Sequence, residues 1–343
     1  MSYQPQFTIT PSLLTQVEAV AALRERILGA AVELTWIPAL QKDTRTRNVH
    51  ASTAIEGNPL TLEQVRALEE GRELATSGVR AKREVVNYFA GLRYVEKRAS
   101  MKRIGHNNIL ELHRILAGEV MDQGEAGRYR TISVRVGRYV PPPPSAVSGL
   151  MFELLEWWNK ESVKLSPVLS SAILHYRFET IHPFADGNGR TGRALALWEL
   201  YRRGFDTHHI FSVDEYYWED RPRYYKELDA VRKAGEDLTG WLEYCAEGLQ
   251  QTLEPDAGAR VVASANPECG EVRQTGAAPP PGAVAQSPAR SPQHGAERNM
   301  ERARHFQAGG DGPAAPAAGR GPGRKSGRQE NRTLRPQELM NSL

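Results

Sequence analysis

The sequence has few cysteines and no long apolar run. Its two cysteines, Cys245 and Cys269, form no CxxC or CxxxC spacing, so we expect neither a disulfide framework nor a cysteine zinc site. No stretch of about 18 apolar residues occurs, which argues against a transmembrane helix, and the first residues lack a basic region followed by an apolar segment. We therefore expect a cytoplasmic protein in a reducing compartment, with no membrane partner.

Aromatic residues are almost absent after residue 254. From Pro255 onward Phe306 is the only aromatic residue, whereas 11 of the 22 prolines and 12 of the 30 glycines lie in this stretch. Such a composition cannot bury enough apolar surface to offset the entropy lost on ordering. We expect residues 255–343 to be a disordered tail; their bias toward arginine is equally compatible with a frameshifted module.

The excess of positive charge belongs to the same tail. Residues 255–343 hold 12 Arg and Lys against 8 Asp and Glu, whereas residues 1–254 hold 32 against 33. A body so close to neutrality lacks the basic surface that nucleic-acid grooves require. Nucleic acid is therefore not an expected partner of the folded body.

Helical periodicity dominates residues 1–254. The apolar residues between 169 and 176 follow the i, i+3, i+4, i+7 spacing of one buried stripe, and Thr61 and Gln64 predict a capping box at the start of another helix. Residues 129–140 instead alternate β-branched and polar side chains before a proline run, which predicts a short β-hairpin. The expected fold class is all-α with one hairpin, and the predicted helices span 13–31, 62–74, 82–96, 109–120, 147–160, 190–203 and 221–232.

Residues 182–193, which read HPFADGNGRTGR, are the most informative stretch. The glycines on either side of Asn188 allow positive φ, so that backbone N–H groups can converge on an anion where the next helix begins. Arg190 and Arg193 lie three residues apart in the first helical turn, where each cation costs roughly 0.3 to 1 kcal/mol unless an anion binds there. The segment therefore predicts a polyphosphate site.

Other readings of this stretch are weaker. Residues 187–192 fit the dinucleotide pattern GxGxxG, with Asp206 near the distance of a ribose-binding acid, but helical periodicity precedes the loop and no βαβ alternation occurs. No GxxxxGK[ST] loop is present. His175, His208 and His209 accompany no HExxH motif and are expected to be packing or surface residues.

The stretch from His182 to Arg193 resembles the signature of the Fic, or Fido, family, HxFx[D/E]GNGRxxR, with every defining position filled. The likeness extends to residues 127–130, to the proline run and to Tyr224 and Tyr225, so it covers about residues 1–250. It implies an all-helical Fic-type domain with a hairpin flap. It also implies an enzyme that transfers AMP from ATP to a Tyr, Thr or Ser hydroxyl of a target protein.

The resemblance and the chemistry together assign roles. His182 is the expected general base toward the hydroxyl, and Asp186 the expected ligand of Mg²⁺, whose other ligands are water and phosphate oxygens. Asn188 and nearby N–H groups would hold the α-phosphate, while Arg190 and Arg193 would neutralise the β- and γ-phosphates. The flap would bind the target by strand addition, and the tyrosine pair lies either beside the nucleotide or in the core. The other positions assigned to the nucleotide or the flap are Gly187, Gly189, Thr191, Gly192, Val134, Arg135, Val136, Gly137, Tyr224 and Tyr225.

Residues 52–58, which read STAIEGN, resemble the inhibitory motif [S/T]xxxE[G/N] of the family subclass with an N-terminal inhibitory helix. Ser52 and Glu56 fill its defining positions. Gly57 ends the preceding helix, so that Glu56 lies at the negative helix end, where a carboxylate needs a cation. We expect Glu56 to pair with Arg193 and to occupy the position of the γ-phosphate.

The expected organisation is an N-terminal helical region with the inhibitory motif (1–95), a Fic catalytic core (96–254) and the tail (255–343). Two other functions stay open: a phosphodiesterase that removes AMP, with Glu56 positioning a water, and a non-catalytic nucleotide-binding regulator. The sequence leaves the target, self-modification and a homodimer open. It departs from the family at Arg232, where many relatives have asparagine, and in lacking a winged-helix module.

Overall fold

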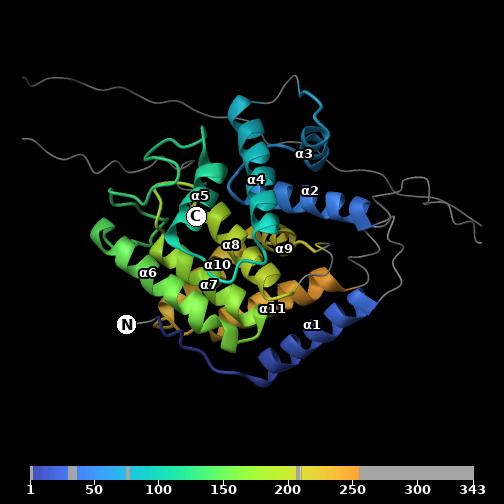
Figure 1. The fold of residues 1–343 in the computed structure, drawn as a ribbon. Helices are drawn as coiled ribbons and strands as arrows, with labels where there is room; N and C mark the ends of the chain where they lie inside the picture. Colours follow the sequence, from blue (N-terminus) through green and yellow to red (C-terminus); the bar gives the residue numbers. More distant parts are fainter. Residues whose placement is uncertain (1–2, 30–36, 75–77, 206–208, 210, 255–343) are drawn as a thin grey trace, which may run out of the picture. The chain divides into compact units, whose positions relative to one another are not determined.

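The structure is a computed structural model that describes residues 3–29, 37–74, 78–205, 209 and 211–254, all within one compact unit (Figure 1). The predicted tail at 255–343, together with Cys269, Asp206 and His208, lies outside these residues. The described part forms eleven α-helices and one short 3₁₀ helix, η1 (Ser162–Lys164). The helices are α1 (Pro11–Gly29), α2 (Ile37–Ile55), α3 (Leu62–Glu69), α4 (Val79–Lys97), α5 (His106–Ala117), α6 (Pro144–Lys160), α7 (Pro167–Ile181), α8 (Asn188–Arg202), α9 (Val213–Glu219), α10 (Arg221–Lys233) and α11 (Thr239–Leu253).

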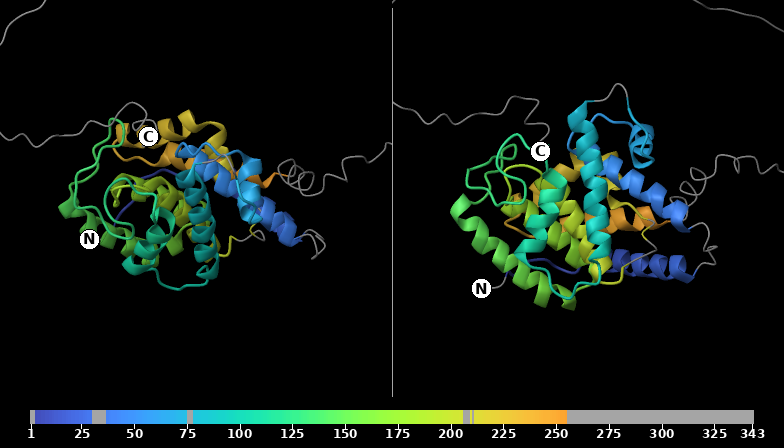
Figure 2. Two further views of the ribbon diagram at one scale, coloured as in Figure 1. Left: turned by 90° about the horizontal axis from the view of Figure 1, so that it is seen from above. Right: turned by 45° about the horizontal axis from the view of Figure 1, so that its top comes forward.

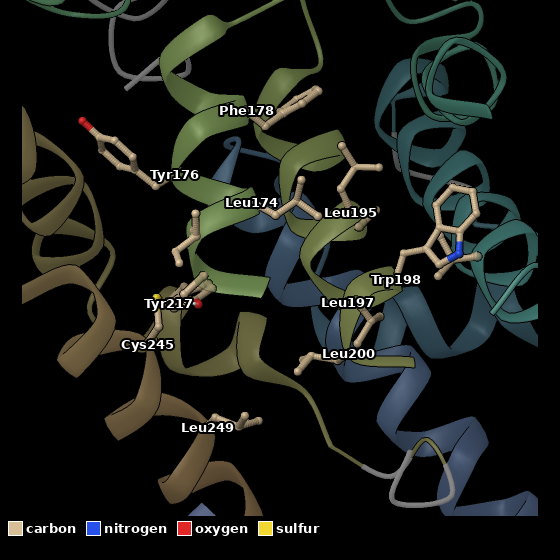
Figure 3. Packing of buried hydrophobic residues seen from close by; sticks show 14 of the residues in the cluster. Leu174, Tyr176, Phe178, Leu195, Leu197, Trp198, Leu200, Tyr217, Cys245 and Leu249 are labelled. Atoms are coloured by element: carbon tan, nitrogen blue, oxygen red, sulfur yellow. Dashed lines mark hydrogen bonds between the residues drawn. The ribbon is translucent and has the colours of Figure 1, made fainter. Parts of the chain in front are cut away.

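The helices α7 and α8 form a central antiparallel hairpin whose loop carries the signature (Figure 1). Both are buried around almost their whole circumference, as expected of helices in the middle of a core. Around them pack α4 and α5 on the α8 side and α6 and α11 on the α7 side. Figure 3 shows part of this core, with Leu174 of α7 near Leu195 of α8, and Tyr217 of α9 beside Cys245 of α11.

Helix α2 brings the N-terminal part of the chain to the start of α8. It packs against α3, α4 and α9 and contacts α8, as the two views of Figure 2 also show for α2 beside α4. It ends at Ile55, because Gly57 adopts a positive φ of 91° and its N–H bonds back to the carbonyl of Ala54. The predicted capping box at Thr61 and Gln64 is confirmed and starts α3. The turn between these two helices is thus fixed at both ends.

Most predicted helices are present, with shifted ends. The helix predicted at 62–74 stops at Glu69, and the helix predicted at 190–203 begins two residues earlier, at Asn188. The prediction for 13–31 is met as far as Gly29, after which the chain is outside the described residues. The helices α2, α9 and α11 are not among those predicted from the sequence.

The β-hairpin predicted at 129–140 is wrong. The structure has there a single antiparallel bridge, in which Val136 and Tyr139 exchange two backbone hydrogen bonds, and no strand is assigned in the described part of the chain. The alternating β-branched residues do not face a core, because Ile132 and Val140 are exposed. Without a buried face, a two-stranded ribbon is not stable in water, so the flap is a loop with one bridge.

The membrane prediction can be tested only in part. Within the ranges given above, no helix is both long and apolar enough to cross a bilayer.

Candidate active site

The loop from His182 to Gly187 turns sharply between the two central helices. His182 has a left-handed conformation (φ 48°), which ends α7, and Gly187 has φ 75°, which precedes α8. Phe184 is fully buried and stacks on the ring of His113 with centroids 3.5 Å apart. The amide of Asn188 closes the loop by accepting from the N–H of Phe184 (2.9 Å) and donating to its carbonyl (3.0 Å). The loop is therefore rigid, and a non-glycine residue in the left-handed region is a form of strain common at functional sites.

Two further side chains hold the loop from outside. The buried guanidinium of Arg130 donates to the carbonyls of His182 (2.7 Å) and Pro142 (2.5 Å), and its backbone N–H donates to Pro183. His113 accepts from the N–H of Gly127 at Nδ1, which leaves Nε2–H to donate to the carbonyl of Asp186. Burial lowers the pKa of His113 to about 4, so this ring is neutral and its two hydrogen bonds persist at neutral pH.

His182 is mostly buried, with 15% of its side chain exposed. Burial lowers its pKa to about 3, against a smaller opposing effect from the backbone of Glu179, so the imidazole is neutral over the physiological range. Its Nδ1 is buried and makes no hydrogen bond of normal geometry among the described residues. The nearest carboxylate oxygen is Oε2 of Glu179, at 3.7 Å.

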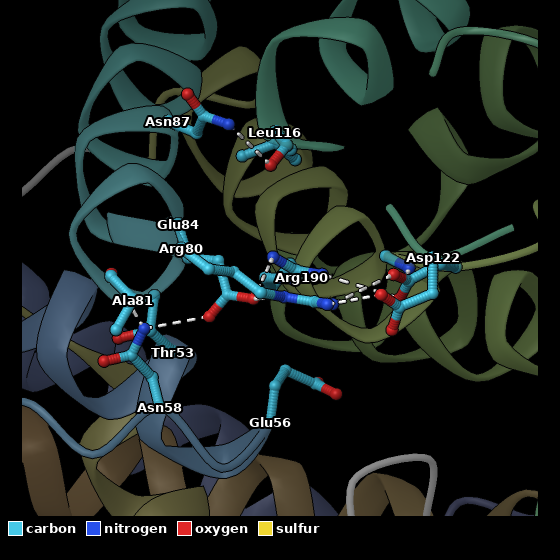
Figure 4. Close-up of polar contacts among 12 residues, drawn as sticks. Thr53, Glu56, Asn58, Arg80, Ala81, Glu84, Asn87, Leu116, Asp122 and Arg190 are labelled. Carbon is cyan, nitrogen blue, oxygen red and sulfur yellow. Dashed lines mark hydrogen bonds and ion pairs between the residues drawn. The ribbon is translucent and has the colours of Figure 1, made fainter. Parts of the chain in front are cut away.

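Arg190 lies at the opening of α8 and is almost fully buried. Its Nη2 is 3.6 Å from Asp186 and its Nη1 is 3.9 Å from Glu84, both beyond hydrogen-bond range. Neither Nε nor Nη1 has a hydrogen-bond partner within the described ranges. Figure 4 shows Glu84 between Arg190 and Asn58, which donates to it at 2.9 Å. A buried cation with free N–H groups at a helix N-terminus fits an anion that is not part of the chain.

Arg193 is held by the end of α2. Its Nη2 donates to Oε1 of Glu56 (2.7 Å) and to the carbonyl of Ser52 (2.9 Å), and its Nε donates to the Ser52 hydroxyl (2.8 Å). Asp214 of α9 adds a carboxylate 3.8 Å from Nε and accepts from the hydroxyl of Tyr88 at 3.1 Å. Only 1% of the Arg193 side chain is exposed, against 20% for Glu56. The ion pair expected between Glu56 and Arg193 is thus present.

Glu56 also lies against the glycine turn. A Cβ added to Gly189 would come within 2.2 Å of Oε1 of Glu56, so the missing side chain makes room for an oxygen atom. Gly189 is helical, and only Gly187 uses the positive φ that both glycines were expected to supply. The carboxylate of Glu56 therefore fills an anion-sized space bounded by Gly189 and Arg193, the residue types that would receive a phosphate.

Several residues predicted to bind the nucleotide have side chains that form hydrogen bonds within the protein instead. The side chain of Asn188 is fully used within the loop, so only its backbone N–H is available to a phosphate. Tyr224 is 1% exposed and forms a hydrogen bond with His175 in the core. Tyr225 is partly exposed and donates to the carbonyl of Ile55 at the end of α2 (3.3 Å).

The remaining residues predicted for the nucleotide site and the flap also make contacts within the protein. The Thr191 hydroxyl is buried and donates to the carbonyl of Gly187, and Gly192 lies against Glu179. The flap residues Val134, Arg135, Val136 and Gly137 lie in the loop that Arg130 and Tyr139 pin to α7. They do not come from a strand.

The part of the chain that the structure describes contains no group of three or more His, Cys, Asp or Glu side chains able to enclose a metal ion. Asp186 is the carboxylate at the mouth of the loop, with about a third of its side chain exposed, beside Arg190 and with Oδ2 4.0 Å from Arg80. Mg²⁺ commonly takes one or two carboxylates and completes its shell with water and phosphate oxygens. The donor set therefore fits a magnesium ion that arrives with a polyphosphate.

Five buried or half-buried residues of the site were not predicted from the sequence. Arg130 lies within residues 127–130, which resemble the family, but no role was assigned to it; Glu179 stands three residues before His182, and the other three belong to no motif. The tertiary fold alone brings in the others. The five are Glu84, His113, Arg130, Glu179 and Asp214.

Comparison with known proteins identifies the same region. The Fic/DOC family profile matches residues 103–200, which include the signature loop. Protein adenylyltransferase fic-1 of Caenorhabditis elegans is 35% identical over 237 residues, which cover 68% of this chain and 45% of that protein. Protein adenylyltransferase Fic of Drosophila willistoni is 34% identical over 218 residues, covering 62% and 42%. The chain spans less than half the length of these relatives.

Solved structures share the fold. The crystal structure of a Fic family protein from Desulfovibrio desulfuricans matches with a TM-score of 0.67 and 32% identity, over 75% of this chain and 78% of that one. A fragment of Caenorhabditis elegans Fic-1 matches with a TM-score of 0.63 and 29% identity, over 73% of each chain. Since sequence, fold and signature loop all agree over most of the described residues, this chain belongs to the Fic/DOC family.

Proposed function

We propose that this chain is a protein adenylyltransferase, which transfers AMP from ATP to a Tyr, Thr or Ser hydroxyl of a target protein and is restrained by Glu56. The observation that carries the proposal is the pair of buried arginines at the start of α8. Among the described residues, Nε and Nη1 of Arg190 have no hydrogen-bond partner, and Arg193 pairs with the carboxylate of Glu56, which lies against Gly189. Two buried arginines, a glycine-containing turn at the start of a helix and a neutral imidazole next to it are suited to the transfer of a group from a polyphosphate.

The residues would share the work as follows. Mg-ATP, when bound, supplies the adenylyl group and the pyrophosphate that leaves. Asp186 would hold the metal, Arg190 and Arg193 would stabilise the charge that grows on the departing oxygens, and the N–H groups of the turn would hold the transferred phosphate.

His182 would act on the target hydroxyl. The ring is neutral, so an unprotonated nitrogen accepts the hydroxyl proton as the new O–P bond forms and the P–O bond to pyrophosphate breaks. A positioned base of this kind contributes about 10² to 10⁴ in rate. Its backbone is fixed by Arg130, so that the base is held in place before the substrate arrives.

Glu56 would be the restraint. As long as its carboxylate bonds to Arg193, a γ-phosphate cannot use this guanidinium, and ATP would bind in an unproductive pose. Release would require the end of α2 to move, which breaks the Arg193 bonds to Ser52 and the bond from Tyr225 to Ile55.

The test is a labelling experiment. The Glu56→Gly protein is incubated with Mg²⁺ and ATP labelled either at the α- or at the γ-phosphate, and label is followed on the protein itself and on a cell extract. We expect label from the α position only, little label with the unsubstituted protein, and none with Glu56→Gly/His182→Ala. Transfer from the γ position would indicate a kinase, and absence of any transfer would refute the proposal.

Removal of AMP is the second candidate. Its support is that Glu56 stays partly exposed at the mouth of the phosphate cradle, where a carboxylate would orient a water. Release of AMP from a previously labelled target by the unsubstituted protein, lost in Glu56→Gly, would favour this direction.

A further inference from the structure

The ring of His182 lies beside the carboxylate of Glu179, next to the catalytic loop. Nδ1 of His182 has no hydrogen-bond partner among the described residues, and Oε2 of Glu179 is 3.7 Å from it. A buried polar atom without a partner costs roughly 1 to 3 kcal/mol. A hydrogen bond from Nδ1 to Oε2 would remove this cost at His182.

A small adjustment brings the pair within hydrogen-bond distance. Glu179 lies in the last turn of α7 and His182 is the left-handed residue that ends it, and this turn of the backbone brings the ring to 3.7 Å from the carboxylate. Hydrogen bonds of catalytic groups are often long before substrate binds and shorten in the reactive complex. The carboxyl of Glu179 has little other freedom, because it is wedged against Gly192, where an added Cβ would lie 2.4 Å from Oε1.

We propose that Glu179 is the positioning residue of His182: its carboxylate accepts Nδ1–H, fixes the tautomer with an unprotonated Nε2, and raises the basicity of the ring. The inference rests on the proposed transfer reaction. In that reaction the hydroxyl proton moves to Nε2 as the O–P bond to the target forms and the P–O bond to pyrophosphate breaks. Glu179 keeps its bond to Nδ1–H throughout and stabilises the imidazolium.

The surroundings of Glu179 link this dyad to the restraint. Charged and titratable groups face Glu179 from four helices: Glu56 of α2, His175 of α7 with His182 at its end, Arg193 of α8, and Tyr224 and Arg232 of α10. The pKa of Glu179 is raised to about 7, chiefly by burial; Glu56 also raises it, whereas Arg193 and Arg232 lower it. Loss of Glu56 therefore favours the ionised form that accepts the His182 proton.

The first test needs no activity. In the Glu56→Gly protein without nucleotide, the ¹⁵N resonances of the His182 ring are assigned by comparison with Glu56→Gly/His182→Ala. We expect a neutral ring with the proton on Nδ1, and a shift of both nitrogens that follows the titration of the Glu179 carboxyl. A proton on Nε2, or His182 resonances whose chemical shifts do not change as Glu179 titrates, would overturn the inference.

The second test separates positioning from folding. Glu179→Gln preserves size and an acceptor oxygen but cannot ionise, and Glu179→Ala removes the acceptor. In the Glu56→Gly background we expect kcat to fall at least about tenfold with Gln and further with Ala, within the 10² to 10⁴ that the whole base supplies, while KM for ATP changes less than about twofold.

The outcomes distinguish the two proposals. A parallel loss in kcat and rise in KM, or an unchanged pH profile of kcat in Glu179→Gln, would show a merely structural role for Glu179. If the Glu56→Gly protein transfers no AMP, the proposed function fails, whereas the ring resonances still decide whether Glu179 orients His182. His175→Gln is the matched control, because His175 lies one turn earlier on the same helix and bonds to Tyr224.

Discussion

Replacing Glu56 by glutamine removes the charge opposite Arg193 with almost no change in volume. The guanidinium of Arg193 is 1% exposed and has Glu56 as its closest carboxylate, at 2.7 Å. Removing one partner of a fully buried ion pair costs about 3 to 5 kcal/mol. Here Ser52 and Asp214 remain in place, and Glu56 is 20% exposed, so water can partly replace it. We expect a loss of about 1 to 3 kcal/mol in the free energy of unfolding.

The assay is equilibrium unfolding in urea, with and without Mg-ATP. Glu70→Gln is the matched control, since Glu70 also caps a helix end and pairs with an arginine, but with the exposed Arg72, where solvent screens the pair and it contributes little to stability. Mg-ATP should stabilise Glu56→Gln more than the unsubstituted protein, because the triphosphate replaces the lost anion. Equal stability of the two variants, with equal gains from Mg-ATP, would refute the role of Glu56 as the occupant of a phosphate position.

Three other substitutions probe the remaining parts of the site. Asp186→Asn in the Glu56→Gly background should lower kcat at least about 10²-fold and abolish the gain in ATP affinity from Mg²⁺ in calorimetry; an unchanged Mg²⁺ effect would place the metal elsewhere. Burial raises the pKa of Glu179 to about 7 from its usual 4.5, so its contribution to stability is present below about pH 4.5 and is lost as the pH rises through 7, by about 3 kcal/mol. Glu179→Gln should therefore reduce the drop in stability between pH 5 and pH 8, and an identical drop would contradict the assignment. Arg130→Lys cannot reproduce the planar fork that reaches several carbonyls, so we expect a loss of about 2 kcal/mol and a matching loss of activity; a fully active, equally stable variant would show that the loop holds its shape alone.

The signature loop and its partner Glu56 could be predicted from the sequence because they depend on interactions between residues that are close in the chain. Glycines, a helix start and two adjacent cations in residues 182–193 call for an anion whatever surrounds them. Likewise a glutamate at a helix end before Gly57 calls for a cation, and the structure places Arg193 there.

The rest depends on contacts that no local pattern carries. Helix α2 has no simple apolar stripe, because it buries polar residues such as Asp43, which pairs with Arg47 and Arg66. Helix α9 is too short, at seven residues, for a periodic signal. Helix α11 does bury Trp241, Cys245 and Leu249 at four-residue spacing, a signal that was present in the sequence.

The flap shows the opposite error, and Tyr224 takes one of the two positions that the sequence left open. Residues 129–140 have the alternation of a strand, but Ile132 and Val140 are exposed, and the backbone is held instead by Arg130, whose side chain donates to the carbonyl of Ile132 and whose N–H donates to that of Pro183. Tyr224 fits the family position yet fills the core, where it stacks on Tyr217. Tertiary packing, which a pattern of residue types does not contain, decided both cases.

The central claim is that one space beside Arg193 and Gly189 receives either the carboxylate of Glu56 or a phosphate. A crystal structure of the Glu56→Gly protein with Mg²⁺ and a non-hydrolysable ATP analogue tests it most directly. The account predicts the γ-phosphate on the guanidinium of Arg193, Mg²⁺ on Asp186, and the α-phosphate within reach of His182. A triphosphate bound away from both arginines, or an imidazole of His182 closed off from the α-phosphate, would contradict it.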